Sequence, residues 1–214
     1  MSRTAAARTT TRSSPGAAAV WVVVVIAAII GSLVYQLAPS SAPSSSPAPS
    51  GDHRGTTSES DGAVTEDDGV LPNRVTVFDD RYPGVARVDP DLLRALRAAA
   101  TDAAGDGIRL LVNSGWRSRD YQDQLLREAV SQYGSRSAAA RWVATADTSP
   151  HVAGDAIDIG PARAAAWLAD HGAAYGLCRV YRNEPWHFEL RLRAVDRGCP
   201  RPYADPTHDP RNRP

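Results

Sequence analysis

Lysine is absent from this 214-residue chain, so all 24 basic side chains are arginines. We attribute this to the base composition of the gene and not to a chemical requirement. Three arginines and no acid fall within the first 38 residues, which leaves 21 arginines against 24 acids in the remainder. A mildly acidic main part argues against nucleic acid as a partner, because phosphate binding needs a basic face.

Charge is also missing from residues 17–38, and Val20 to Leu37 is nearly all apolar. A run of about 20 apolar residues is long enough to cross a bilayer as a helix. The arginines precede it, which predicts a cytoplasmic N-terminus at residues 1–16. We therefore predict a single-pass membrane anchor at 17–38 that holds the rest of the chain outside the cytoplasm. A cleaved signal peptide is the alternative.

Cysteine is nearly absent too, since Cys178 and Cys199 are the only two. Both follow the predicted anchor, and an oxidising compartment favours a disulfide between them. Such a bridge would staple the segment at 184–189 that lies between them. Two free thiols, or thiol metal ligands, are the alternatives.

Apolar residues are sparse in the segment that follows the anchor. Residues 39–70 are rich in Pro, Ser, Gly and Thr, and such a composition cannot bury enough surface to offset the entropy of ordering. We predict a disordered linker with a mean reach of about 30 Å. Residues 71–204 suit one compact domain, and 205–214 are expected to form a disordered tail.

Within the compact domain, helical and strand patterns are mixed without regular βαβ alternation, which predicts an α+β fold. An Asp cap followed by proline predicts the start of a helix at Asp89-Pro90. Further helices are expected from Ser118 or Asp120 to Gly134, at 137–144 and at 161–171, the last ending at Gly172. The expected strands are 108–112, 156–159, 177–181 and 186–190.

Two short segments concentrate side chains that bind metals. The first runs from Ser149 to Asp158 and the second from Glu184 to Glu189. A catalytic zinc ion takes three protein ligands, His or carboxylate among them, and leaves a fourth position for water. His151, Asp158 and His187 could supply these three ligands.

The local pattern supports this assignment. Gly154 allows the chain to turn back after His151, and Asp158 lies in an apolar strand, where a carboxylate is costly to bury unless it is paired or coordinated. Strand alternation places His187 and Glu189 on one face and the flanking aromatic residues on the other.

This constellation resembles the VanY-type D-alanyl-D-alanine carboxypeptidases, which belong to a superfamily with the VanX-type dipeptidases and the Hedgehog signalling domain. The family pattern S-x-H-x-x-G-x-A-x-D, followed by E-x-W-H, is matched at every fixed position by Ser149, His151, Gly154, Ala156, Asp158, Glu184, Trp186 and His187. An upstream segment, Ser114 to Ser118 with Gln122, resembles the family's G-Y-R-S-x-x-x-Q, with Trp116 in place of Tyr.

The resemblance implies a Hedgehog-like fold with a small antiparallel sheet and flanking helices. It implies that His151, Asp158 and His187 bind zinc and that Glu184 is the general base and acid. It also implies that Arg117 orients the substrate carbonyl or carboxylate, and that two further side chains lie near the substrate, Ser149 and Gln122. Glu189 departs from the family pattern, and it could support His187 or change the charge near the substrate.

Each residue also has a plainer explanation. Either histidine could be structural, Asp158 could be a turn residue and Glu184 a solvated loop acid. Arg117 could form a surface ion pair, Ser149 could be a turn residue before proline, and Gln122 could lie on a solvated helix face.

Two functions follow from these patterns. The first is a zinc carboxypeptidase that removes the C-terminal D-Ala of peptidoglycan stem peptides, with L,D-carboxypeptidase, D,D-dipeptidase and endopeptidase activities as variants of the same chemistry. The second is a non-catalytic wall-binding module that keeps the fold, because a fold alone does not establish activity.

Overall fold

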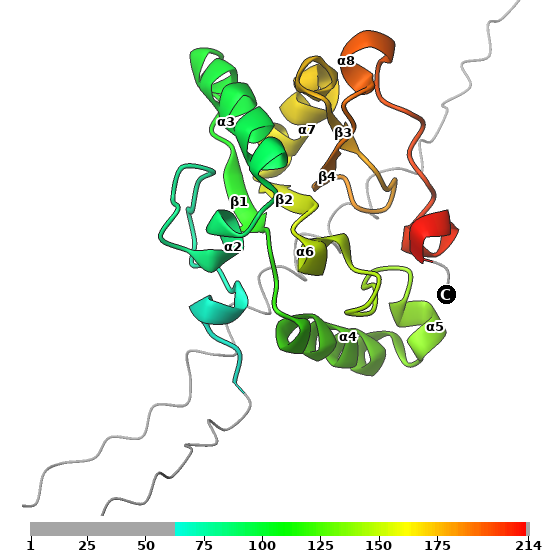
Figure 1. Cartoon of the computed structure of the whole chain (residues 1–214). Coiled ribbons are helices and arrows are strands. Elements are labelled where there is room, and N and C mark those ends of the chain that lie inside the picture. The colour runs from blue at the N-terminus through cyan, green and yellow to red at the C-terminus, as the bar shows by residue number, and fades with distance from the viewer. Residues whose placement is uncertain (1–62, 213–214) are drawn as a thin grey trace, which may run out of the picture. The chain divides into compact units, whose positions relative to one another are not determined.

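The computed structural model describes residues 63–212 (Figure 1). Four antiparallel strands form one sheet in the order β1-β2-β4-β3. In β2 and β4 the register places Asp158 directly opposite His187. The predicted α+β fold with a small antiparallel sheet is therefore confirmed. The strands are β1 (Leu111–Ser114), β2 (Ala156–Gly160), β3 (Leu177–Arg179) and β4 (His187–Leu190).

Two helices pack against the sheet and form the main core. Helix α3 (Pro90–Gly105) begins as predicted, because Asp89 accepts hydrogen bonds from the backbone N–H groups of Asp91 and Leu92. Helix α7 (Ala162–His171) also lies where the sequence predicts it. Their apolar faces meet those of β2 and β4 in a core that includes Leu92, Leu96, Ala99, Ala164, Leu168, Ile157, Ile159 and Phe188.

Helices α4 (Arg119–Tyr133) and α5 (Arg136–Ala139) enclose a second, smaller apolar cluster and lie together at one end of the domain (Figure 1). Ser118 caps α4, and Gly134 ends it in the left-handed conformation, as predicted. Helix α5 is shorter than the predicted helix 137–144, which the structure replaces with turns beyond Ala139.

Other elements differ from the sequence prediction. Strand β1 lies later than the predicted 108–112, because pairing with β2 extends to Ser114, opposite Asp158. Three short helices were not predicted, since a helix of one turn has no periodicity to detect. They are α2 (Pro83–Ala86), α6 (Pro150–Ala153) and α8 (Ala194–Arg197).

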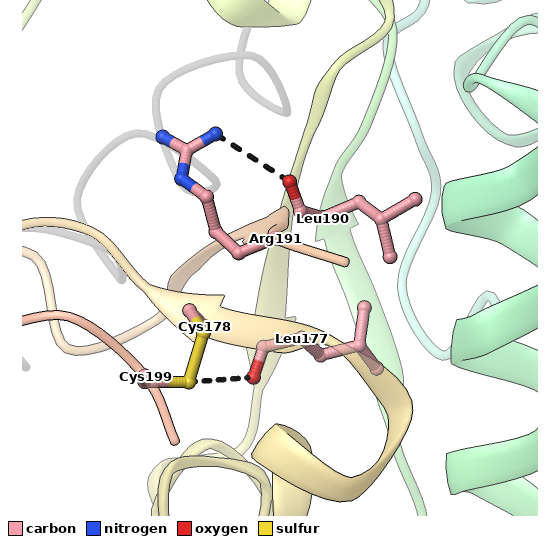
Figure 2. Close-up of a disulfide and its surroundings, with 5 residues drawn as sticks. All are labelled: Leu177, Cys178, Leu190, Arg191 and Cys199. Carbon is pink, nitrogen blue, oxygen red and sulfur yellow. Dashed lines mark hydrogen bonds between the residues drawn. A yellow bond between two sulfur atoms is a disulfide. The ribbon is translucent and has the colours of Figure 1, made fainter. Parts of the chain in front are cut away.

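A disulfide joins Cys178 on β3 to Cys199, which follows α8, and confirms the predicted pairing. Figure 2 shows the bridge beside Leu177, whose carbonyl oxygen lies 3.5 Å from the Cys199 sulfur. Cys178 is also the strand partner of Glu189. The bridge therefore ties the segment after α8 to the edge strand β3, which pairs with the strand of the second metal-binding motif, β4.

The C-terminal residues differ from the expected disordered tail at 205–214. Residues 206–208 and 210–212 form two 3-10 turns, and Asp205 and Asp209 are buried. At the other end, a 3-10 helix at Glu66–Asp68 lies inside the segment predicted as linker. Tertiary contacts order these polar segments, and composition alone does not report such contacts.

The predicted N-terminus 1–16, the anchor 17–38 and most of the linker 39–70 lie outside the described residues. Between residues 63 and 212, no helix is both long enough and apolar enough to cross a membrane.

Candidate metal centre

The side chains of His151, Asp158 and His187 converge at one end of the sheet. The separation between His151 Nε2 and His187 Nδ1 is 3.3 Å. Asp158 Oδ1 lies 3.5 Å from the first nitrogen and 3.3 Å from the second. All three residues are buried. Three donor atoms from three segments thus form a compact triangle, as the sequence predicted.

The turn that carries His151 depends on a close backbone approach. His151 lies on α6, which ends at Gly154 with a φ of 84°. A Cβ at Gly154 would lie 2.6 Å from the carbonyl oxygen of Arg87, so only glycine fits here. The His151 ring donates from Nδ1 to the Gly115 carbonyl over 2.8 Å. This bond leaves the lone pair of Nε2 facing the other two donors.

Asp158 is held by a guanidinium on the side away from the histidines. Arg117 Nη2 donates to Asp158 Oδ2 over 2.9 Å, and both side chains are largely buried. Burial alone would raise the pKa of Asp158, but the two imidazoles and Arg117 outweigh it and hold the pKa well below its usual value. Asp158 is therefore ionised and oriented.

His187 is oriented by Glu189, two residues along β4. His187 Nε2 lies 3.3 Å from Glu189 Oε1, so it can donate there while Nδ1 faces Asp158. Burial works against a charged ring, but the carboxylates of Asp158 and Glu189 raise the pKa of His187 to about 10. The predicted strand alternation is confirmed, and Glu189 supports His187, which was one of the two roles left open.

The pKa of His151 is shifted in the opposite direction. Its complete burial and the nearby charge of Arg117 lower its pKa. The two rings therefore differ. His151 favours the neutral form that binds a metal, whereas the carboxylates beside His187 favour its protonated form while no metal is bound.

Glu184 lies beside His187, on the loop that enters β4. Its Oε2 is 3.8 Å from His187 Nδ1. Burial raises the pKa of Glu184 to about 7, and the nearby charge of Asp158 adds to this effect. The alternative of a solvated loop acid is wrong, because this side chain is buried. A carboxyl group with such a pKa can both take up and release a proton near neutral pH.

The structure gives a different account of Arg117 and Gln122. Arg117 is no surface ion pair: it binds Ser114 Oγ over 2.7 Å, in addition to Asp158. Gln122 is 1% exposed, which rules out the solvated helix face. Its oxygen accepts from Arg117 over 3.1 Å and its nitrogen donates to the Ala144 carbonyl over 2.9 Å. Gln122 therefore helps to position Arg117, and its predicted contact with the substrate stays a prediction.

Ser149 precedes α6 and is buried, yet its hydroxyl oxygen has no hydrogen-bond partner and does not cap the helix. Such a group is available to a ligand, so its predicted role near the substrate stays a prediction.

The donor set fits a zinc ion. Separations of about 3.3 Å between ligand atoms are those of a tetrahedron with bonds of about 2.0–2.1 Å. Among the described residues, buried Asp158 Oδ1 and Glu184 Oε1 are left without a hydrogen-bond partner. Each ligand also has an orienting partner on its far side, as metal ligands usually do. The fold and these residues define a domain with a metal centre of the catalytic type, with three protein ligands and a carboxylate beside them.

The particular family follows from comparison with known proteins. The family model described as VanY, D-alanyl-D-alanine carboxypeptidase, matches residues 85–191, which span every site residue from Arg117 to Glu189. The chain belongs to this family, as the motifs predicted.

One curated relative has low sequence identity to this chain. A D-alanyl-D-alanine carboxypeptidase of Enterococcus faecalis (strain ATCC 700802 / V583) is 28% identical over 143 residues, which cover 55% of this chain and 53% of that protein. The chain thus spans about half the length of this curated relative.

Two solved structures are similar to part of this chain. A vancomycin-resistance D,D-pentapeptidase VanY in complex with Zn(II) is 27% identical, with a TM-score of 0.46 over 48% of this chain and 72% of that one. The LD-carboxypeptidase LdcB is 25% identical, with a TM-score of 0.48 over 62% of this chain and 73% of that one.

Sequence reasoning missed three parts of the site. The Gly115 carbonyl and Ser114 Oγ act on His151 and Arg117 through contacts that no motif spacing reports. The third part is Arg211, which binds Glu189 from 22 residues further along the chain. The sequence signal for a restricted backbone in this segment is its prolines, at positions 206 and 210 among the described residues.

Proposed function

We propose that this protein is a zinc-dependent carboxypeptidase that removes the C-terminal D-Ala from peptidoglycan stem peptides. The observation that carries the proposal is the buried triangle of His151, Asp158 and His187, with the buried carboxylate of Glu184 beside His187 and its Oε1 without a hydrogen-bond partner. Membership of the VanY family supports the peptide substrate.

The chemistry that zinc supplies when bound is a lowered pKa for water and a polarised carbonyl. Glu184 then accepts the proton of the attacking water at Oε1 and passes it to the departing amine. A pKa of about 7 suits both transfers. Arg117 keeps Asp158 in place, and its two remaining N–H groups are available to a substrate carboxylate or to a developing negative oxygen.

Hydrolysis of a defined peptide tests this proposal. The full-length chain, loaded with zinc, is incubated with a stem pentapeptide ending in D-Ala-D-Ala, and the products are identified by mass spectrometry. We expect release of D-Ala, and Glu184→Gln should lower kcat by about 10²–10⁴-fold. The exposed Glu128 on α4 gives a matched control, Glu128→Gln, which should leave kcat unchanged.

Other outcomes would contradict the proposal in separate ways. Release of a dipeptide would indicate a D,D-dipeptidase. Cleavage only of peptides with an L,D bond would indicate an L,D-carboxypeptidase, and cleavage only of cross-linked peptides would indicate an endopeptidase. Equal and negligible D-Ala release by wild type and Glu184→Gln, with the peptide still bound, would indicate a binding module.

We also propose that the enzyme acts at the outer face of the cell membrane. The apolar run at 17–38, the arginines before it and the polar linker after it support this location. Protease treatment of intact cells should remove residues 63–212 and leave the N-terminus protected. Survival of the whole chain under conditions that digest a known surface protein would argue against it.

A further inference from the structure

The C-terminal residues 203–212 return to the sheet beside the metal centre, and we call them the C-terminal strap. Tyr203 pairs with the chain after β3: its N–H donates to the Val180 carbonyl and its carbonyl accepts from the Arg182 N–H, both over 2.9 Å. Asp205 and Asp209 are 1% and 0% exposed. A segment held by backbone pairing and buried carboxylates has a fixed position relative to the sheet.

Arg211, near the end of the strap, forms a bidentate ion pair with Glu189. Its Nη1 donates to Glu189 Oε2 over 2.7 Å, and its Nη2 donates to Oε1 over 3.1 Å. Glu189 Oε1 is also the atom that faces His187 Nε2 at 3.3 Å. Arg211 therefore fixes the carboxylate oxygen that sets the orientation of a metal ligand.

A second contact path joins the strap to the same ring. Asp209 accepts from Arg211 Nε at 3.1 Å and from the Tyr181 hydroxyl at 3.1 Å. The Tyr181 ring packs against the His187 ring, with centroids 5.0 Å apart. The strap therefore contacts His187 indirectly in two ways. Glu189 faces the Nε2 atom of the His187 ring, and Tyr181 packs against the ring itself.

Charge balance explains why Glu189 needs the strap. Glu189 is 1% exposed and lies on the same face of the sheet as Asp158, so an unpaired carboxylate would be costly. Arg191 supplies one contact, between its Nη2 and Glu189 Oε2 at 2.7 Å, but makes none with Oε1 in the described structure. Arg211 is the guanidinium that holds the oxygen facing His187.

We infer that the C-terminal strap belongs functionally to the metal centre. Arg211 is a positioning residue that fixes the orientation of the His187 ring through Glu189. This inference rests on the metal-binding part of the proposed function. It concerns how firmly the site holds its ion and does not depend on which peptide is cut.

The test compares zinc affinity among variants of the full-length chain. Arg211→Ala removes the fork, Arg211→Lys keeps the charge but not the fork, and Arg197→Ala on α8 removes an exposed arginine as the matched control. The zinc dissociation constant is measured by competition with a coloured chelator. We expect it to rise by about 10–100-fold in Arg211→Ala, by less in Arg211→Lys, and not at all in Arg197→Ala.

A second readout needs no metal. The ¹⁵N chemical shifts of the His187 ring in zinc-free protein report which nitrogen carries the proton and how firmly it is bonded. We expect the shifts to change in both Arg211 variants and not in the control, while those of the His151 ring stay constant. If Arg211→Ala does not fold, as judged by circular dichroism, the comparison rests on Arg211→Lys.

The outcomes separate this inference from the proposed function. Unchanged zinc affinity and unchanged His187 shifts in folded Arg211 variants would overturn the role of the strap. If wild type binds zinc tightly, loses affinity on Arg211 substitution and still cleaves no peptide, the strap inference holds and the proposed activity fails. If wild type binds no zinc, both fail.

Discussion

Each of the three ligand residues has a hydrogen-bond partner on the side that faces away from the other two ligands. Asp158 has Arg117, His151 has the Gly115 carbonyl and His187 has Glu189. Such a partner fixes which atom of a ligand is available and in which direction it points. The affinity of the centre for zinc therefore depends on residues that never touch the ion.

Arg117 gives the clearest test at this scale. Replacing it by Ala leaves Asp158 Oδ2 buried without its donor, so zinc affinity should fall by about 10–100-fold and the free energy of unfolding by about 3 kcal/mol. Chelator competition and urea unfolding measure the two effects. Arg119→Ala is the matched control, because Arg119 pairs with Asp147 at the surface, and it should cost under about 1 kcal/mol.

Secondary-structure elements bring the motifs together through pairing and tight turns. Antiparallel pairing of β2 with β4 sets Asp158 opposite His187, and the one-turn helix α6 returns the chain from His151 to β2. The close approach of Gly154 to the Arg87 carbonyl ties this turn to the start of α3. The turn between the first two ligands is thus held close to the backbone before α3.

Gly154→Ala should therefore destabilise the protein by more than the left-handed conformation alone requires. Gly134 is a matched control, because it has a similar φ of 77° but no atom within 4 Å of an added Cβ. We expect about 1–2 kcal/mol for Gly134→Ala and at least about 3 kcal/mol for Gly154→Ala, where strain and a clash combine. Urea unfolding measures both, and equal losses would contradict the role of the backbone contact.

The described domain is held at its C-terminal side by one covalent link and one set of buried charges. The disulfide ties the segment after α8 to β3, and the strap beyond it returns to Tyr181 and Glu189. Both contact the side of the sheet formed by β4 and the edge strand β3. The disulfide and the strap therefore both lie beside the strand that carries His187.

Loss of the disulfide should cost about 3 kcal/mol in free energy of unfolding, since it closes a loop with a sequence separation of 21 residues. The double variant Cys178→Ala/Cys199→Ala, compared with wild type in urea, measures this. Zinc stoichiometry should be retained, because no sulfur belongs to the donor set. A variant as stable as wild type would show that packing alone holds this segment.

Asp205 makes the strap sensitive to acid. Burial alone would raise its pKa, but hydrogen bonds from Thr207, His208 and Arg141 lower it from 3.8 to about 2. Because the folded pKa is below the unfolded one, the stabilisation is present above pH 4 and is lost as the pH falls towards 2.

Asp205→Asn should therefore lower the free energy of unfolding by about 2 kcal/mol at pH 7 and by progressively less between pH 4 and 2. Urea unfolding across this pH range checks the sign. The exposed Asp196 on α8 gives the control Asp196→Asn, which should change stability little at any pH. A constant difference from pH 7 to pH 2 would contradict the ionic origin.

The sequence by itself determined the donor residues and most of the elements that carry them. Ligand types at fixed spacing, a glycine between them and an apolar strand around Asp158 are local features, so the motifs predicted His151, Asp158, His187 and Glu184. Capping and periodicity likewise predicted α3, α4 and α7, because these signals lie within the helices themselves.

Tertiary structure alone decided what surrounds those donors. A solvated helix face was the alternative for Gln122, and residues 205–214 were expected to be disordered, because both are polar. Burial of a polar group is favourable only with a partner, and the partners here come from distant segments: Arg117 for Gln122, and Glu189 for Arg211. The sequence names the ligands, whereas the fold selects the groups that orient them.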